Sequence, residues 1–226
     1  MSQYDAVKQQ VIDISRSMVE KGFLIGTGGN VSVRVPGKNR MAVTPSSYDY
    51  MKMVLDDVCI VDWGMTQLEG SMRPSIESGM HAAVYEHRPD VNVVIHTHQV
   101  SASAVALTNR AIPGLFDEQV RFLGTTVALV SYGLSGTEQR KDNIVRKLSN
   151  NCNAYIMKNH GALTLGSSPE RAMLNVELLE KCAAAFLLAY YTGERLTRIP
   201  KPVQEYLFSK LRVDQELGTA TNEHGK

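Results

Sequence analysis

Apolar positions along the chain follow two periods, one typical of helices and one typical of strands. Residues 4–20 carry apolar side chains at helical spacing, and Gly22 fits the end of that helix. Residues 31–35 alternate strictly between apolar and polar, and a short turn leads into "MAVT", so the pattern predicts a β-hairpin. Further strands are predicted over residues 57–62, 91–96, 125–132 and 154–160.

Capping residues and apolar spacing predict several more helices. Ser75 fits the N-cap of a helix over residues 76–87. The apolar stripe of this helix would comprise Ile76, Met80 and Val84. Further helices are predicted over residues 101–107, 138–148 and 169–191. The polar end of the chain, from about residue 217, is expected to form a flexible tail.

The order of these elements predicts the fold class. No repeat, low-complexity tract or linker interrupts the chain, so residues 1–226 are expected to form one domain. Several adjacent strands lack the helical crossover that parallel pairing needs. The prediction is therefore an α/β domain with much antiparallel pairing in a central sheet that helices flank.

Composition narrows the classes of partner and the compartment. A net charge of +1, with lysine and arginine scattered along the chain, gives no electrostatic reason to expect nucleic acid or an anionic membrane. The three cysteines are widely spaced and form no CxxC pair, so neither a disulfide framework nor a thiolate zinc site is indicated. The polar N-terminus lacks the apolar core of a signal peptide, and no apolar run has the length of a membrane span. A cytoplasmic, soluble protein is expected.

Histidines supply the first candidate chemistry. His96 and His98 stand two positions apart at the end of a predicted strand, so their side chains point to one face and can bind one divalent metal ion. On spacing alone, the alternative is one core histidine and one solvated histidine. His160 ends another predicted strand, just before a glycine, and strand ends meet in space. The three histidines are a candidate metal site, whereas His81 is expected to pack in the core.

A carboxylate and a group of small polar residues extend this candidate site. Glu77 lies in the first turn of a predicted helix, where it either complements the helix dipole or works as a base beside the metal. The stretch "GTGGN" lacks the Walker and GxGxxG patterns, but its exposed backbone N–H groups suit a phosphate group. Ser46, Ser47 and Ser75 add hydroxyl and amide donors, unless each serves only a turn or a helix cap.

Taken in order, these segments resemble the class II aldolase/adducin family, which includes fuculose-phosphate aldolases and ribulose-phosphate 4-epimerases. The resemblance rests on "GTGGNVSVR", "AVTPSS", "RPSIESGMHAAVYEHRPDVNVVIHTHQVSASAVAL" and "YIMKNHGALTLG", and it extends to the long helix near Tyr191. It implies one family-type domain over residues 1–226. It also implies a three-layer α/β/α fold with a largely antiparallel central sheet, and a homotetramer with active sites near the subunit interfaces.

The resemblance also implies roles for the candidate residues. The metal ligands, for zinc or alternatively manganese, would be His96, His98 and His160, and Glu77 would be the acid/base carboxylate, able to approach the metal when substrate is absent. The phosphate-binding positions would be Gly29, Asn30, Ser46, Ser47 and Ser75. The implied reaction is reversible retro-aldol cleavage of a ketose 1-phosphate to dihydroxyacetone phosphate and an aldehyde, in which the cation stabilises the developing enediolate charge.

Departures from the fuculose-phosphate aldolases bear on the substrate. These aldolases have a serine where this chain has Ile76, and Thr-Gly where it has Ser46 and Ser47. They also carry a tyrosine from the neighbouring subunit in a segment that here reads "PGLFDEQV". A related sugar such as a 5-deoxypentulose 1-phosphate is therefore an equal candidate, and Tyr206 is a candidate for closing over the substrate.

Other activities remain open from the sequence. A sugar-phosphate 4-epimerase, or a phospho-sugar decarboxylase or dehydratase, would use the same metal site. Hydrolysis by a metal-bound hydroxide also suits three histidines, but the phosphate-type segments argue against it. An adducin-like scaffold without catalysis is a further alternative, against which the intact set of Glu77, His96, His98 and His160 argues.

Overall fold

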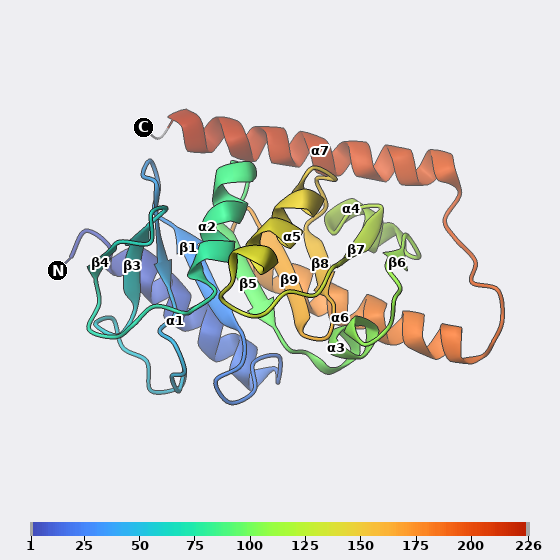
Figure 1. Ribbon diagram of the computed structural model, residues 1–226. Coiled ribbons are helices and arrows are strands. Elements are labelled where there is room, and N and C mark those ends of the chain that lie inside the picture. Colours follow the sequence, from blue (N-terminus) through green and yellow to red (C-terminus); the bar gives the residue numbers. More distant parts are fainter. Residues whose placement is uncertain (1, 225–226) are drawn as a thin grey trace.

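One mixed sheet organises the molecule (Figure 1). The structure is a computed structural model that describes residues 2–224. Within these residues nine strands pair in the order β4-β3-β2-β1-β5-β9-β8-β7-β6. The strands are β1 (Asn30–Arg34), β2 (Arg40–Val43), β3 (Cys59–Asp62), β4 (Gln67–Glu69), β5 (Val93–Thr97), β6 (Ile112–Pro113), β7 (Thr126–Val130), β8 (Ala154–Met157) and β9 (Gly161–Gly166).

Helices cover both faces of this sheet. The helices are α1 (Asp5–Glu20), α2 (Ser78–His87), α3 (Val100–Ala106), α4 (Asp117–Phe122), α5 (Glu138–Leu148), α6 (Pro169–Tyr191) and α7 (Lys201–His224). Helices α1, α3 and α6 pack on one face, and α2 and α5 pack together on the other (Figure 1). None of these helices combines the length and the apolar character needed to cross a membrane.

The α/β class is confirmed, but the expected emphasis on antiparallel pairing needs correction. Strands β7 and β8 pair in parallel, whereas the other neighbours in the sheet pair antiparallel. Helix α5 lies between β7 and β8 in the chain and provides the crossover that a parallel pair requires. The sheet is therefore mixed.

Side-chain alternation along β5 divides the core in two. Val93 and Ile95 belong to the apolar cluster under α1 and α6, and Val94 belongs to the cluster under α2 and α5. Because successive strand side chains point to opposite faces, His96 shares the face of Val94. The histidine is thereby directed to the face that carries α2 and α5.

The start of α2 differs from the sequence prediction. The helix begins at Ser78, with Glu77 at the N-cap, so Ser75 does not cap it. The backbone N–H of Ser75 instead donates to the carbonyl of Thr44 at 3.1 Å, beside a bridge between Pro45 and Pro74. This pairing holds residues 74–75 in an extended conformation, and Ile76, expected in the apolar stripe, is 66% exposed.

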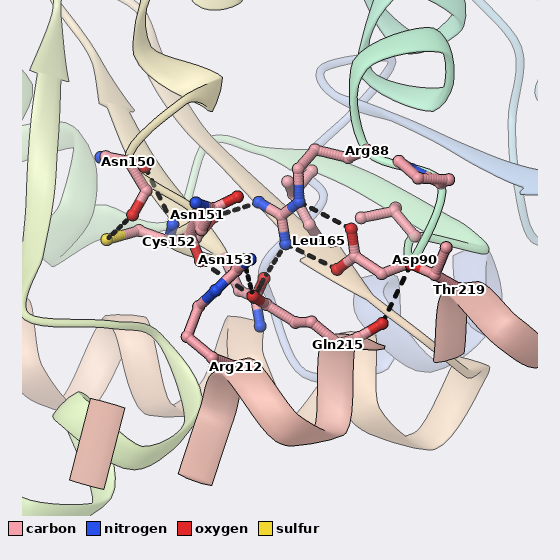
Figure 2. A network of polar contacts seen from close by, with 12 residues as sticks. Arg88, Asp90, Asn150, Asn151, Cys152, Asn153, Leu165, Arg212, Gln215 and Thr219 are labelled. Carbon is pink, nitrogen blue, oxygen red and sulfur yellow. Dashed lines mark hydrogen bonds and ion pairs between the residues drawn. The ribbon is translucent and has the colours of Figure 1, made fainter. Parts of the chain in front are cut away.

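Helix α7, which the sequence pattern did not predict, runs along one edge of the molecule (Figure 1). It covers residues 217–224 of the segment expected to be a flexible tail, while residues 225–226 lie outside the described chain. The expectation of flexibility itself stays a prediction. The side-chain amide of Gln215, buried on α7, donates to the carbonyl of Asn151 and to Asn153 Oδ1 (Figure 2).

Arg88 connects this contact to the body of the domain (Figure 2). Its guanidinium, only 3% exposed, forms two parallel hydrogen bonds with the carboxylate of Asp90, at 2.8 and 2.7 Å. The same guanidinium donates to Asn153 Oδ1 and to the carbonyl of Cys152, both at 2.8 Å. All of these groups are buried, so the carboxylate depends on the guanidinium for compensation.

We predict that Arg88→Met lowers the free energy of unfolding by about 3–5 kcal/mol, because it leaves the buried Asp90 carboxylate without its cation. The matched control is Lys52→Met, which removes the cation from an exposed pair with Asp49 and should cost about 1 kcal/mol or less. Urea denaturation of the two variants measures both values. Equal effects would contradict a stabilising role for the buried pair.

Candidate active site

Three imidazole rings converge at one end of the central strands. The candidate ligand atoms of His96, His98 and His160 all lie within 4.8 Å of one another. The Nε2 atoms of His96 and His98 are 3.0 Å apart, and the ring of His160 stacks on that of His96 with 4.7 Å between centroids. The structure thus brings together the three histidines that the sequence predicted as a metal site.

The local backbone explains how two distant segments supply these rings. His96 is part of β5, and His98 follows its last residue, whereas His160 lies in the turn between β8 and β9 rather than at a strand end. Asn159 adopts a positive φ of 54° in that turn, which asparagine tolerates well. At Gly161 a Cβ atom would stand 2.4 Å from the carbonyl oxygen of Thr97 and 2.7 Å from the His98 ring. The glycine therefore permits the turn to approach β5.

The hydrogen bonds of His96 determine which nitrogen is free for a ligand. Its Nδ1 lies 2.8 Å from the carbonyl oxygen of Ala162, which can only accept, so Nδ1 carries the proton. In the neutral ring, Nε2 then carries a lone pair, which is directed at His98 and Glu77. A backbone carbonyl that orients a histidine in this manner is typical of metal ligands.

Glu77 lies against the same three rings. Its Oε2 accepts a hydrogen bond from the side-chain amide of Asn30 at 2.9 Å and lies 3.3 Å from His96 Nε2. Its Oε1 lies 3.3 Å from His160 Nε2. Glu77 is only 6% exposed, so the carboxylate is held inside the cluster rather than in solvent at a helix end.

Burial and mutual contact set the protonation of these groups. Burial lowers the pKa of His96 to about 3 and lowers that of His98. Burial would raise the pKa of Glu77, but the adjacent His96 and His160 rings and the Asn30 amide lower it well below its usual range. Neutral imidazoles beside an ionised carboxylate are the state that binds a cation.

This cluster fits a divalent metal ion. Within the described chain, two of its buried atoms, Glu77 Oε1 and His160 Nε2, have no hydrogen-bond partner. The His96 Nε2 lone pair also faces a carboxylate oxygen at 3.3 Å, an arrangement that repels without a positive charge between the two atoms. Three histidines with a carboxylate alongside match the donor set of a zinc ion with an open position.

A cavity of about 140 Å³ opens beside the cluster. Glu77 and His98 form part of its wall. All five residues expected to bind the substrate phosphate also line it: Gly29, Asn30, Ser46, Ser47 and Ser75. Ser47 adopts a positive φ of 53°, and Tyr50 donates its hydroxyl proton to the Gly29 carbonyl at 2.6 Å. The predicted phosphate segments therefore surround the same space as Glu77 and one predicted metal ligand, His98.

Some residues at this site were not predicted. Ser135, in the loop before α5, lines the cavity, and Arg140 of α5 reaches Glu77. Neither stands in a segment with a recognisable motif, so only the packing of α5 on α2 could reveal them. Tyr206, a candidate for closing over the substrate, is 60% exposed on α7 and does not line the cavity.

Comparisons with known proteins show the family of this chain. The sequence profile of the class II aldolase and adducin N-terminal domain matches residues 9–187. L-fuculose phosphate aldolase of Escherichia coli K12 is 31% identical over 179 residues, covering 79% of this chain and 81% of that protein. A 5-deoxy-D-ribulose 1-phosphate aldolase of Bacillus thuringiensis is 27% identical, covering 83% of this chain and 87% of that protein.

The fold is similar as well. A solved structure of L-fuculose 1-phosphate aldolase superimposes with a TM-score of 0.86 at 30% identity and covers 94% of this chain and 98% of its own. The chain therefore belongs to the class II aldolase and adducin family.

His81 packs beneath the site, as predicted. Its contacts with the buried side chains around it can be tested through its protonation. It is fully buried, and its Nδ1 lies 2.7 Å from the Ser32 hydroxyl, which also contacts Tyr85. Burial lowers the pKa of His81 from 6.5 to about 4. The unfolded chain therefore takes up one more proton than the folded chain as the pH falls through this range, and stability is lost on acidification.

We predict that His81→Gln reduces the pH dependence of the unfolding free energy of metal-free protein between pH 6.5 and 4. The slope should fall by about 1.4 kcal/mol per pH unit, the contribution of one proton. Urea denaturation at a series of pH values, with chelator present, measures it. Identical slopes in wild type and variant would show that His81 titrates equally in both states.

Proposed function

We propose that this protein is a metal-dependent class II aldolase that cleaves a ketose 1-phosphate to dihydroxyacetone phosphate and an aldehyde. One observation carries the proposal: the cavity lined by the predicted phosphate segments also contains His98 and Glu77 of the candidate metal centre. A sugar whose phosphate lies among the serines then has its first carbons beside the histidines and the carboxylate.

Each part of the site has a role in this proposal. In cleavage the C3–C4 bond breaks, the C4 hydroxyl loses its proton to give the aldehyde, and C3 gains a proton to give dihydroxyacetone phosphate. Glu77 delivers the proton to C3, and its ionised form removes that proton in the reverse direction. His96, His98 and His160 hold the divalent ion, which, when bound, supplies a Lewis acid for the charge that develops on the sugar oxygens.

The phosphate is held by backbone and hydroxyl groups. Gly29 contributes from the loop before β1 and Asn30 from the first position of that strand, and the hydroxyls contribute from two further loops at Ser46, Ser47 and Ser75. Asn30 has a second task, because its amide fixes Oε2 of Glu77. This contact couples phosphate binding to the position of the acid/base group.

The sugar is proposed to be a 5-deoxypentulose 1-phosphate or a close relative of fuculose 1-phosphate. Ile76 contributes an exposed apolar side chain to the cavity, where fuculose-phosphate aldolases have a serine. The segment "PGLFDEQV" runs from the end of β6 into the first turn of α4 and contains no tyrosine. The relative named 5-deoxy-D-ribulose 1-phosphate aldolase makes that sugar the first to test.

We further propose a homotetramer with Zn²⁺, or alternatively Mn²⁺, in each subunit, in one domain that includes α7. The family supports the assembly, and the nitrogen ligand set supports zinc. A cytoplasmic location is supported by three buried cysteines that remain free thiols.

The direct test is a coupled assay for dihydroxyacetone phosphate with a panel of ketose 1-phosphates and zinc-loaded protein. We expect turnover of at least one sugar in the wild type. His96→Ala should remain folded but lose stoichiometric zinc and turnover, whereas His87→Ala, at the exposed end of α2, should keep both. Turnover by the His96→Ala variant at the wild-type rate would refute the ligand assignment.

The same assay separates the alternatives. An epimerase would convert its pentulose phosphate without net release of dihydroxyacetone phosphate, and a decarboxylase would release carbon dioxide. An adducin-like scaffold would show neither stoichiometric metal nor turnover.

Glu77→Gln tests the acid/base role. Because the amide can keep the hydrogen-bonded position but cannot carry the proton, we expect metal to stay bound while kcat falls by roughly 10²–10⁴-fold. Zinc analysis and steady-state kinetics on the same preparation measure the two properties. Loss of the metal from a folded variant would make Glu77 chiefly a ligand.

A further inference from the structure

Arg140 brings a buried positive charge to the candidate active site. It lies in the first turn of α5, is 5% exposed, and its Nη1 is 3.6 Å from Oε1 of Glu77. A cation in the first turn of a helix stands at the unfavourable end of the helix dipole. Arg140 is therefore placed against its local electrostatics, and Glu77 is the carboxylate that compensates it.

The loop before α5 fixes the direction of this guanidinium. Nε and Nη2 of Arg140 both donate to the carbonyl of Gly133, and Nη1 lies 3.8 Å from the sulfur of Met157. A Cβ atom at Gly133 would stand 2.9 Å from the Arg140 backbone, so only glycine permits this approach. With one edge of the fork bound to the loop, the remaining nitrogen faces Glu77.

Glu77 consequently lies between the candidate metal site and the positive charge of Arg140. On one side are the histidines, with Nε2 atoms of His96 and His160 each 3.3 Å from a carboxylate oxygen. On the other side is the guanidinium, which shares Oε1 with His160. A cation held by the histidines and the Arg140 charge therefore compete for one carboxylate.

The competition for Glu77 indicates that Arg140 has a functional role rather than only a packing role. A permanent positive charge near the histidines opposes binding of a divalent cation. A site selected only for metal affinity would favour an apolar side chain at this position. The arginine is useful if the carboxylate has to stay off the metal, so that the metal's open position is free for the sugar.

We propose that Arg140 is a positioning residue that draws Glu77 away from the metal and holds it where it can exchange a proton with the substrate. The inference rests on the proposed aldolase function. Its energetic part, the competition between Arg140 and the metal for Glu77, is measurable without turnover.

The test compares Zn²⁺ affinity and kinetics of full-length Arg140→Met and Arg140→Lys. In the Met variant Glu77 is released to bind the ion, so we expect roughly tenfold tighter Zn²⁺ binding, measured against a chromophoric chelator, and a roughly tenfold lower kcat. KM should change by less than about threefold, because the phosphate contacts are retained. The Lys variant keeps the charge but not the two hydrogen bonds to Gly133, so both measurements should lie between those of wild type and the Met variant.

Two controls test whether Arg140 affects Zn²⁺ affinity through Glu77. Lys141→Met removes the neighbouring positive charge, which pairs with Glu138 instead, and should leave Zn²⁺ affinity unchanged. In the Glu77→Gln background the carboxylate is absent, so adding Arg140→Met should no longer tighten Zn²⁺ binding. Arg140→Gln repeats the comparison if the Met variant does not fold.

The outcomes are separable. Tighter binding only when Glu77 is present supports the proposal. Equal tightening in both backgrounds would mean direct repulsion between Arg140 and the ion, and weaker binding in the neutral variants would mean a purely structural role; either result overturns it. If wild type binds Zn²⁺ but turns over no ketose phosphate, the proposed aldolase function is wrong. The Zn²⁺ affinities of the single and double variants still show whether Arg140 and the metal compete for Glu77.

Discussion

The site depends on one electrostatic constraint, the convergence of nitrogen lone pairs and an ionised carboxylate in a largely buried space. His96 Nε2 faces both His98 and Glu77, because its Nδ1 proton is committed to a backbone carbonyl. Such groups repel one another unless a positive charge lies among them. In the function proposed above, a divalent cation supplies this positive charge.

Different layers of the fold position different parts of the site. The apolar clusters on either face of the sheet fix β5, whose alternation directs His96 to the side of α2 and α5. The N-termini of these two helices then present Glu77 and Arg140 to the rings. The segments proposed to bind phosphate lie around the same end of the sheet and line the cavity beside Glu77 and His98.

Local chemistry explains what the sequence predicts and what it does not. The metal site could be predicted because its signals are short. They are the two-residue spacing of His96 and His98 and the glycine that follows His160. Helix α7 and the contact of Arg140 with Glu77 depend on tertiary packing that no short pattern encodes, whereas the parallel β7–β8 pair follows from the predicted helix between these two strands. The start of α2 was displaced because residues 74–75 pair with the segment after β2, an interaction that overrides local capping preference.

The most direct measurement is anomalous diffraction at the zinc edge from crystals of the full chain grown with one equivalent of Zn²⁺. We expect one dominant peak per subunit, about 2.0–2.1 Å from a nitrogen of each of the rings of His96, His98 and His160. A well-ordered site without a peak, or a single peak bound elsewhere with these rings turned apart, would contradict the account.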